Sequence, residues 1–122
     1  MNRVHRFVTN DLTVRVAAVN ATEVVREMQS ILRAAPLATV GVGRAMVGAI
    51  LLASQLKDGQ EVGLLFKGNG PLGSLYAQAS FEGTVRGYCP QPQYYSPNVE
   101  DALNLKKAVG FGHLSVTRAC SE

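Results

Sequence analysis

Residues 62–80, VGLLFKGNGPLGSLYAQAS, decide the fold, because a short turn sequence separates two runs that alternate between apolar and other positions. The turn is 68–71, GNGP. Asn and Gly adopt positive φ at little cost, and Pro71 has no N–H to donate to a sheet, so this tetrapeptide favours a chain reversal. The apolar positions of each run share one face: Val62, Leu64 and Phe66 in the first, and Leu75, Ala77 and Ala79 in the second. The pattern predicts an antiparallel hairpin with one buried face.

Upstream of this hairpin, residues 37–56, LATVGVGRAMVGAILLASQL, are nearly all apolar. Small residues recur at every fourth position, which predicts a helix that packs closely against another element. They are Gly41, Ala45, Ala49 and Ala53. Met46, Ile50 and Leu51 are expected to fill the core around them. Arg44 and the glycines leave an uninterrupted apolar run too short for a membrane, where a charge near the middle is costly. We therefore predict a buried core helix, closed by residues 57–59, and no membrane partner.

The N-terminal part alternates β-branched or aromatic residues with polar or small ones, which predicts strands over 4–9 and 12–19. Residues 20–23, NATE, have the form of a capping box, in which Asn20 accepts a hydrogen bond from a first-turn amide and Glu23 reaches back. The apolar positions that follow are Val24, Met28, Ile31 and Ala35. We predict an amphipathic helix that Pro36 ends.

Downstream of the hairpin, residues 81–83 predict a turn into a third strand over 84–89, which completes a meander. Pro90, Pro92 and Pro97 exclude a central strand from the next segment. Ser96 is a suitable cap for a helix that has Pro97 at its first position and runs to 109, and a last strand follows over 111–117. The fold class predicted is α+β, with antiparallel β-sheets packed against a long apolar helix and shorter amphipathic helices.

Composition describes a single folded domain. The chain has 122 residues, 47% hydrophobic and 17% charged, with a net charge of +3 and a pI near 9.1. The basic residues are scattered, and only Lys106 and Lys107 are adjacent, so no stripe follows a phosphate backbone and we predict no nucleic-acid partner. The first eleven residues carry no apolar export segment, which favours a cytoplasmic protein.

No motif predicts catalysis, so we expect no enzyme and assign no catalytic, cofactor-binding or metal site residues. Cys89 and Cys120 are the only cysteines and form neither a CxxC pair nor a metal-ligand cluster, which predicts two reduced thiols. His5 and His113 are the only histidines and lie in no catalytic motif. A small enzyme that uses His113 or Cys89 is kept as an alternative.

The glycine-rich segments do not match nucleotide-binding loops. Residues 68–71 lack the Lys-Ser/Thr pair of a phosphate loop and precede no helix. Residues 110–112, GFG, follow a helix and precede a strand, the reverse of a dinucleotide fingerprint. A binding surface is the remaining possibility, because aromatic residues gather around the predicted sheet and would mark a partner surface if several shared one exposed face: Tyr76, Phe81, Tyr88, Tyr94, Tyr95 and Phe111.

Six short motifs, taken in order, resemble the N-terminal domain of the 33 kDa chaperonin family, the redox-regulated heat shock protein 33. They are His5-Arg6-Phe7; Asp11 with Val14-Arg15; the Arg44 helix with Leu51-Leu52 and Leu56-Lys57; Gly68 to Leu72; Val85 to Tyr88; and Gly110 to Leu114. The resemblance covers nearly the whole chain. It implies a holdase of the bacterial cytosol that binds unfolding proteins under oxidative stress, without ATP, and prevents their aggregation.

The resemblance also implies a zinc switch that this chain lacks. In the family a C-terminal module carries four cysteines, CxC then CxxC, which hold zinc when reduced and form disulfides when oxidised. Because residues 1–122 contain none of these ligands, we expect an incomplete N-terminal client-binding and dimerisation domain, no cofactor in this chain, and zinc only in the missing module.

An unpaired edge at the last strand favours self-association, so we expect a homo-oligomer, a dimer. The alternative function is an inactive remnant of the chaperone that self-associates without binding clients.

Overall fold

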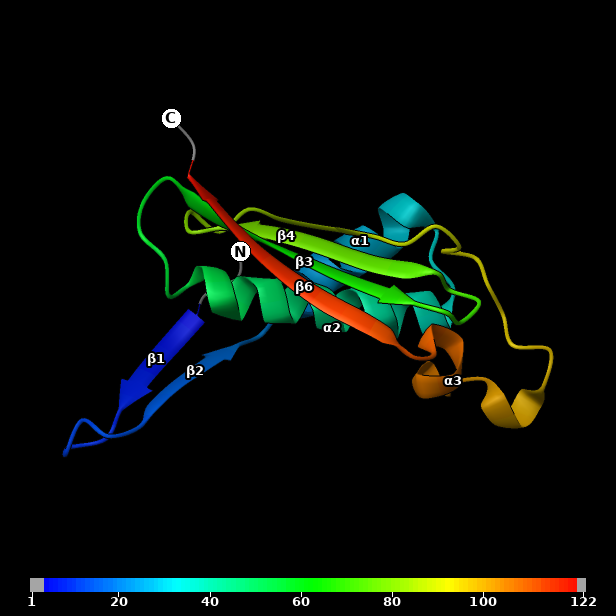
Figure 1. The fold of residues 1–122 in the computed structure, drawn as a ribbon, viewed down its shortest axis with the longest axis horizontal. Helices are drawn as coiled ribbons and strands as arrows, with labels where there is room; N and C mark the ends of the chain where they lie inside the picture. The colour runs from blue at the N-terminus through cyan, green and yellow to red at the C-terminus, as the bar shows by residue number, and fades with distance from the viewer. Residues whose placement is uncertain (1–3, 121–122) are drawn as a thin grey trace.

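The computed structural model describes residues 4–120 and has two antiparallel sheets around one long helix (Figure 1). The predicted α+β class is confirmed. In chain order the elements are β1 (Val4–Val8), β2 (Arg15–Val19), α1 (Thr22–Leu32), α2 (Pro36–Ala53), β3 (Gln60–Gly68), β4 (Ser74–Ser80), β5 (Val85–Tyr88), the 3₁₀ helix η1 (Val99–Asp101), α3 (Leu105–Val109) and β6 (Gly112–Cys120).

The larger sheet has the strand order β5-β4-β3-β6, and every pair is antiparallel. The predicted hairpin is β3–β4, and its apolar face is the one expected, since Leu75, Ala77 and Ala79 are all buried. The predicted meander continues into β5 through a turn in which Gly83 has φ of 103°. The last strand returns to pair with β3 over its whole length, so β3 lies between β4 and β6.

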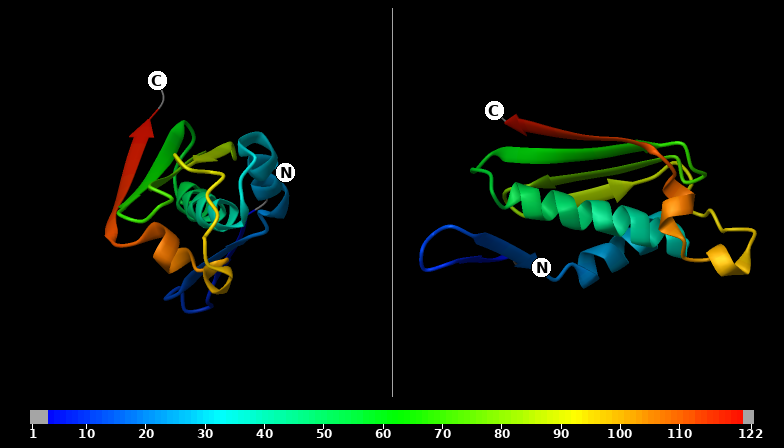
Figure 2. Two further views of the ribbon diagram at one scale, coloured as in Figure 1. Left: turned by 90° about the vertical axis from the view of Figure 1, so that its right-hand side faces the viewer. Right: turned by 60° about the horizontal axis from the view of Figure 1, so that its bottom comes forward.

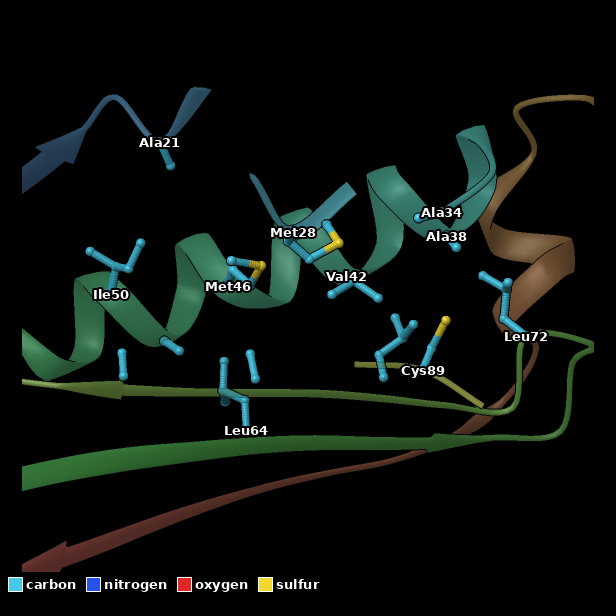
Figure 3. Packing of buried hydrophobic residues seen from close by; sticks show 14 of the residues in the cluster. Ala21, Met28, Ala34, Ala38, Val42, Met46, Ile50, Leu64, Leu72 and Cys89 are labelled. Atoms are coloured by element: carbon cyan, nitrogen blue, oxygen red, sulfur yellow. The ribbon is translucent and has the colours of Figure 1, made fainter. Parts of the chain in front are cut away.

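Helix α2 packs on the inner face of β3, β4 and β5, and half of its residues are buried. It is long and apolar enough to span a membrane by length and composition, but in the structure it is the core helix that the sequence predicts. Met46 and Val42 contact the sheet below them (Figure 3). The backbone of β5 approaches them so closely that a Cβ on Gly87 would lie 2.6 Å from Val42 Cγ1. Close packing of this kind gives protein interiors their density.

Helix α1 is shorter than predicted. It ends at Leu32, where Arg33 adopts the left-handed conformation with φ of 52°, and Pro36 begins α2 instead of ending α1. Pro suits the first helical turn because its missing N–H is not needed there. Asn20 accepts a hydrogen bond from the Thr22 N–H at 3.1 Å, which is one part of the predicted capping box, but the N-cap position is Ala21 and makes no side-chain cap hydrogen bond.

A continuous helix from Pro97 to Val109 is wrong. The structure has the short η1, then a turn, then the five-residue α3, whose N-cap Asn104 accepts a hydrogen bond from Lys107 N–H. A longer helix would need a buried apolar stripe, but Val99 and Leu103 are 93% and 69% exposed. Ser96 instead accepts the N–H of Asn98 in a local turn.

Strands β1 and β2 form a separate two-stranded sheet on the side of α2 opposite the larger sheet (Figure 2). One face of this hairpin points inward: Val4 and Val19 pack against the core, and Arg6 donates to the Ser54 carbonyl at 2.9 Å. The other face carries Phe7 and Val16, which are directly opposite each other and at least half exposed.

Candidate functional site

The residues considered for catalysis lie on different elements. His5 is on β1 and His113 is on β6, which belong to different sheets. Cys89 follows β5 and is completely buried in the core, where burial raises the pKa of its thiol. A buried thiol of raised pKa is a poor nucleophile, so Cys89 acts as a packing residue.

The cysteines and acidic groups give no metal centre in the part of the chain that is described. Cys89 and Cys120 are both free thiols, and residues 4–120 contain no group of three metal-ligating side chains. Glu82 and Asp58 come together where two loops meet. The Gly59 N–H donates to Glu82 at 2.9 Å and lowers the pKa of Glu82 to about 2, and the neighbouring Glu82 raises the pKa of Asp58. This surface pair joins the start of β3 to the β4–β5 turn.

The distinctive surface is the last strand. All nine residues of β6 are exposed, although β3 beside it contributes Val62 and Leu64 to the core. Leu114 and Val116 are 62% and 53% exposed. Because Leu114 pairs with Phe66 and Val116 with Leu64, both lie on the sheet face that α2 covers further in. Helix α2 lies under β3, β4 and β5, and β6 extends the sheet beyond it (Figure 2).

An apolar groove of about 500 Å³ runs beside Leu114, between α2, α3 and the sheet. Its apolar walls include Leu64, Phe66, Leu75, Leu105 and Val109. Among the residues that line it, the charged ones are Arg44 and Lys106, and both are basic. The groove and the exposed face of β6 together form what we call the β6 surface.

The connection between α3 and β6 positions this surface, and sequence reasoning missed it. The GNGP turn is hydrogen-bonded to the segment 108–111, which leads from α3 into β6. The Gly70 N–H donates to the Val109 carbonyl at 2.9 Å, and Asn69 Oδ1 accepts from the Phe111 N–H at 2.9 Å. A side chain at Gly70 would collide with the Ala108 carbonyl, so glycine is needed for this close approach. The Asn-Gly pair predicts the turn, but nothing local predicts which distant segment docks on it.

The aromatic residues do not gather on one exposed face. Tyr76 and Tyr88 are cross-strand partners on the outer face of the sheet, while Tyr94 packs against the core. Phe111 and Tyr95 are 80% and 70% exposed in separate segments. The exposed apolar surface is thus divided between the β6 surface, the outer face of the sheet and the outer face of the β1–β2 hairpin.

The fold and surface define a small α+β domain with a buried helix, an exposed apolar sheet edge and, within residues 4–120, none of the clusters that hold a metal. The family is settled by comparison. The chain belongs to the Hsp33 protein family, whose model matches residues 2–122.

Relatives and a solved structure agree with this assignment. A Synechococcus 33 kDa chaperonin is 43% identical over 108 residues, covering 86% of this chain and 34% of its own length. The Thermus thermophilus 33 kDa chaperonin is 39% identical over 122 residues, covering 98% of this chain and 36% of its own. The crystal structure of the Thermotoga maritima 33 kDa chaperonin matches with a TM-score of 0.88 and 34% identity, over 98% of this chain and 41% of that one. The chain therefore spans about a third of the curated relatives it matches.

Proposed function

We propose that this chain is the N-terminal client-binding part of a holdase chaperone, which binds unfolding proteins and prevents their aggregation. Membership of a family whose relatives are named chaperonins supports the proposal. The observation that carries it is the β6 surface, where Leu114 and Val116 are exposed beside an apolar groove.

The physical basis is burial of apolar area. A non-native protein exposes apolar side chains, and covering them against the β6 surface gains about 25 cal/mol for each Å² removed from water. The contact is reversible and needs no covalent step, so we expect no enzymatic turnover. Any turnover that disappears in His113→Ala would contradict that expectation.

The test is suppression of aggregation. A heat-labile enzyme is warmed with and without a molar excess of the chain, and light scattering is followed. We expect the chain to lower the light scattering of the warmed enzyme. The double variant Leu114→Ser with Val116→Ser should lower it less than the unchanged chain does. No suppression at several-fold molar excess would instead favour the alternative, a self-associating remnant without client activity.

Redox regulation would belong to another part of the intact protein. We propose that the zinc switch of the family lies outside residues 1–122, since Cys89 and Cys120 do not form the CxC and CxxC pattern. The coding sequence downstream of Glu122 tests this directly. Four cysteines in that pattern would support the proposal, and an in-frame stop without them would contradict it.

We also propose a cytoplasmic homodimer. The exposed hairpin face with Phe7 and Val16 supports self-association, because a two-stranded sheet rarely stands alone in water. Light scattering coupled to size exclusion should give the mass of a dimer, and Phe7→Ser should weaken it. A monodisperse monomer at high concentration would overturn the dimer.

A further inference from the structure

The turn between β3 and β4 contains a pair of residues with a chemistry of its own, Asn69-Gly70. Asparagine is a thermolabile residue, because its side-chain amide can form a cyclic imide with the main-chain nitrogen of the next residue. Glycine in the next position favours this reaction, since it has no side chain to hinder the nitrogen and its backbone adopts the required conformation at little cost. No other asparagine in the sequence precedes a glycine. Asn69 is exposed within residues 4–120, so water can reach it.

The reaction has two steps, and its only co-reactant is water. In the first step the Gly70 nitrogen forms a bond to Asn69 Cγ, the bond from Cγ to Nδ2 breaks, and Nδ2 leaves as ammonia with the proton that the Gly70 N–H gives up. In the second step water opens the imide at either carbonyl. Opening at Cγ gives aspartate. Opening at the main-chain carbonyl gives isoaspartate, whose main chain runs through Cβ and Cγ and is longer by a methylene group.

In the folded chain, both reacting groups are held by segment 108–111. The Gly70 N–H donates to the Val109 carbonyl at 2.9 Å, and Asn69 Oδ1 accepts from the Phe111 N–H at 2.9 Å. The Asn69 N–H also donates to the Phe111 carbonyl at 3.0 Å. We call these three hydrogen bonds the turn clamp.

The turn clamp opposes formation of the imide. Bond formation at the Gly70 nitrogen removes the hydrogen that the Val109 carbonyl accepts, and it draws Asn69 Cγ away from the Phe111 N–H. The turn is also packed tightly against this segment, since a Cβ on Gly70 would collide with the Ala108 carbonyl. The reaction therefore requires a local opening in which segment 108–111 leaves the turn.

We propose that Asn69-Gly70 is a deamidation site that the turn clamp protects, and that the reaction proceeds in chains whose clamp has opened. Isoaspartate then prevents the clamp from closing again, because the longer main chain displaces the Gly70 N–H from the Val109 carbonyl. The product is an irreversible mark on a chain in which the connection between α3 and β6 has come loose, as it does on heating. This modification is separate from the proposed holdase function and does not depend on it.

The test measures the loss of ammonia at Asn69 at mildly alkaline pH, with the modified peptide identified by mass spectrometry. We expect the folded chain to react at least about tenfold more slowly than the same chain unfolded in urea. Hydrogen exchange at the Gly70 amide is followed in parallel, at urea concentrations below the unfolding transition. Both rates should rise together, because both require the clamp to open. Asp58 also precedes a glycine, but its imide forms with loss of water and reopens to an acid of unchanged mass, so the two sites are distinguished.

Two glycines with positive φ provide a matched pair of variants. Gly110 has φ of 75°, and a Cβ there would collide with Asn69 Oδ1, so Gly110→Ala should open the clamp and speed ammonia loss by about tenfold. Gly83 has φ of 103°, and an added Cβ would meet nothing within 4 Å. Gly83→Ala therefore introduces backbone strain away from the clamp and should leave the rate unchanged. Far-UV circular dichroism shows whether each variant is folded.

Equal rates in the folded and unfolded chains would overturn the proposal, and so would equal acceleration by Gly110→Ala and Gly83→Ala. If Gly110→Ala does not fold, the urea series on the unchanged chain decides, because ammonia loss that does not follow Gly70 exchange would show that the clamp is not the gate. The isoaspartyl chain is then separated by ion exchange. Its Phe111 amide should exchange faster than in the unmodified chain, and equal protection would show that the modification does not hold the clamp open.

Discussion

Strands β4 and β6 flank β3 on its two sides, yet they differ completely in burial. Inward-facing residues of β4, such as Leu75 and Ala77, are no more than 7% exposed, whereas Leu114 and Val116 of β6 are more than half exposed. All four side chains lie on the same face of one sheet. The difference comes from the position of α2, which packs over β4 but does not extend across the sheet as far as β6 (Figure 2).

The comparison separates apolar residues that stabilise the fold from apolar residues that remain available for contact. Those under α2 are already removed from water when the chain folds, so they stabilise the domain and offer nothing to a partner. Those on β6 keep most of their area in water within residues 4–120, so this area remains available for contact. Strand pairing with β3 holds the second group in place without covering it.

The sharpest test of this comparison uses one cross-strand pair, Leu64 and Val116. Leu64 is 7% exposed, so Leu64→Ala should lower the free energy of unfolding by about 2–4 kcal/mol through lost burial and a cavity. Val116→Ala, on the neighbouring strand, should lower it by about 0.5 kcal/mol. Urea unfolding followed by circular dichroism measures both. A similar loss for the two variants would show that β6 is covered in solution.

The second test concerns how the exposed strand is held in place. Asn69→Ala removes the acceptor of the Phe111 N–H, and we expect a loss of about 1 kcal/mol in the free energy of unfolding. Asn69→Asp keeps a side-chain oxygen at the same position and should recover most of the loss. Hydrogen exchange at the Phe111 amide should accelerate in the alanine variant. If it does not, another contact fixes the start of β6.

The third test concerns α3, the short helix before β6. Asn104 caps it by accepting the Lys107 N–H at 3.1 Å, so Asn104→Ala should cost about 0.5–1 kcal/mol. Asn104→Ser retains a capping oxygen and is the matched control. Urea unfolding measures the difference. An equal loss in both variants would place the contribution in the Asn104 contact with Asp101 instead of the cap.

The parts of this fold that depend on local sequence could be predicted, and those that depend on distant packing could not. The β3–β4 hairpin follows from its Asn-Gly turn and alternation, and α2 follows from its length and apolar composition. The pairing of β6 with β3 joins residues that are far apart in the sequence, such as Gly63 and Thr117, and no local sequence pattern predicts which distant strands pair. The helix predicted over 97–109 failed because exposed Val99 and Leu103 have no apolar surface to pack on.

The same reasoning applies to the β6 surface. Leu114 and Val116 are apolar and alternate along the strand, a pattern that predicts a buried face. Their side chains are exposed because α2 packs on β3, β4 and β5 and does not extend under β6. Its basic character comes from Arg44 and Lys106, which are far apart in sequence and meet at one groove. Membership of the Hsp33 family does not indicate where on the fold this surface lies.

The smallest expected effect is at the β1–β2 turn, the region furthest from the core. The side-chain hydroxyls of Thr9 and Thr13 and the Thr13 N–H all donate to Asp11, at 2.6, 2.7 and 3.1 Å, and lower its pKa from 3.8 to about 2. Because the pKa is lower in the folded state, this stabilisation is present above pH 3.8 and is lost as the pH falls through about 2. We expect the Thr13 amide resonance to shift over that range in NMR spectra. Asp11→Asn keeps an acceptor that does not titrate, so its Thr13 amide should not respond. A response that persists in this variant would place the titrating group elsewhere, and the hairpin would then depend on a contact other than Asp11.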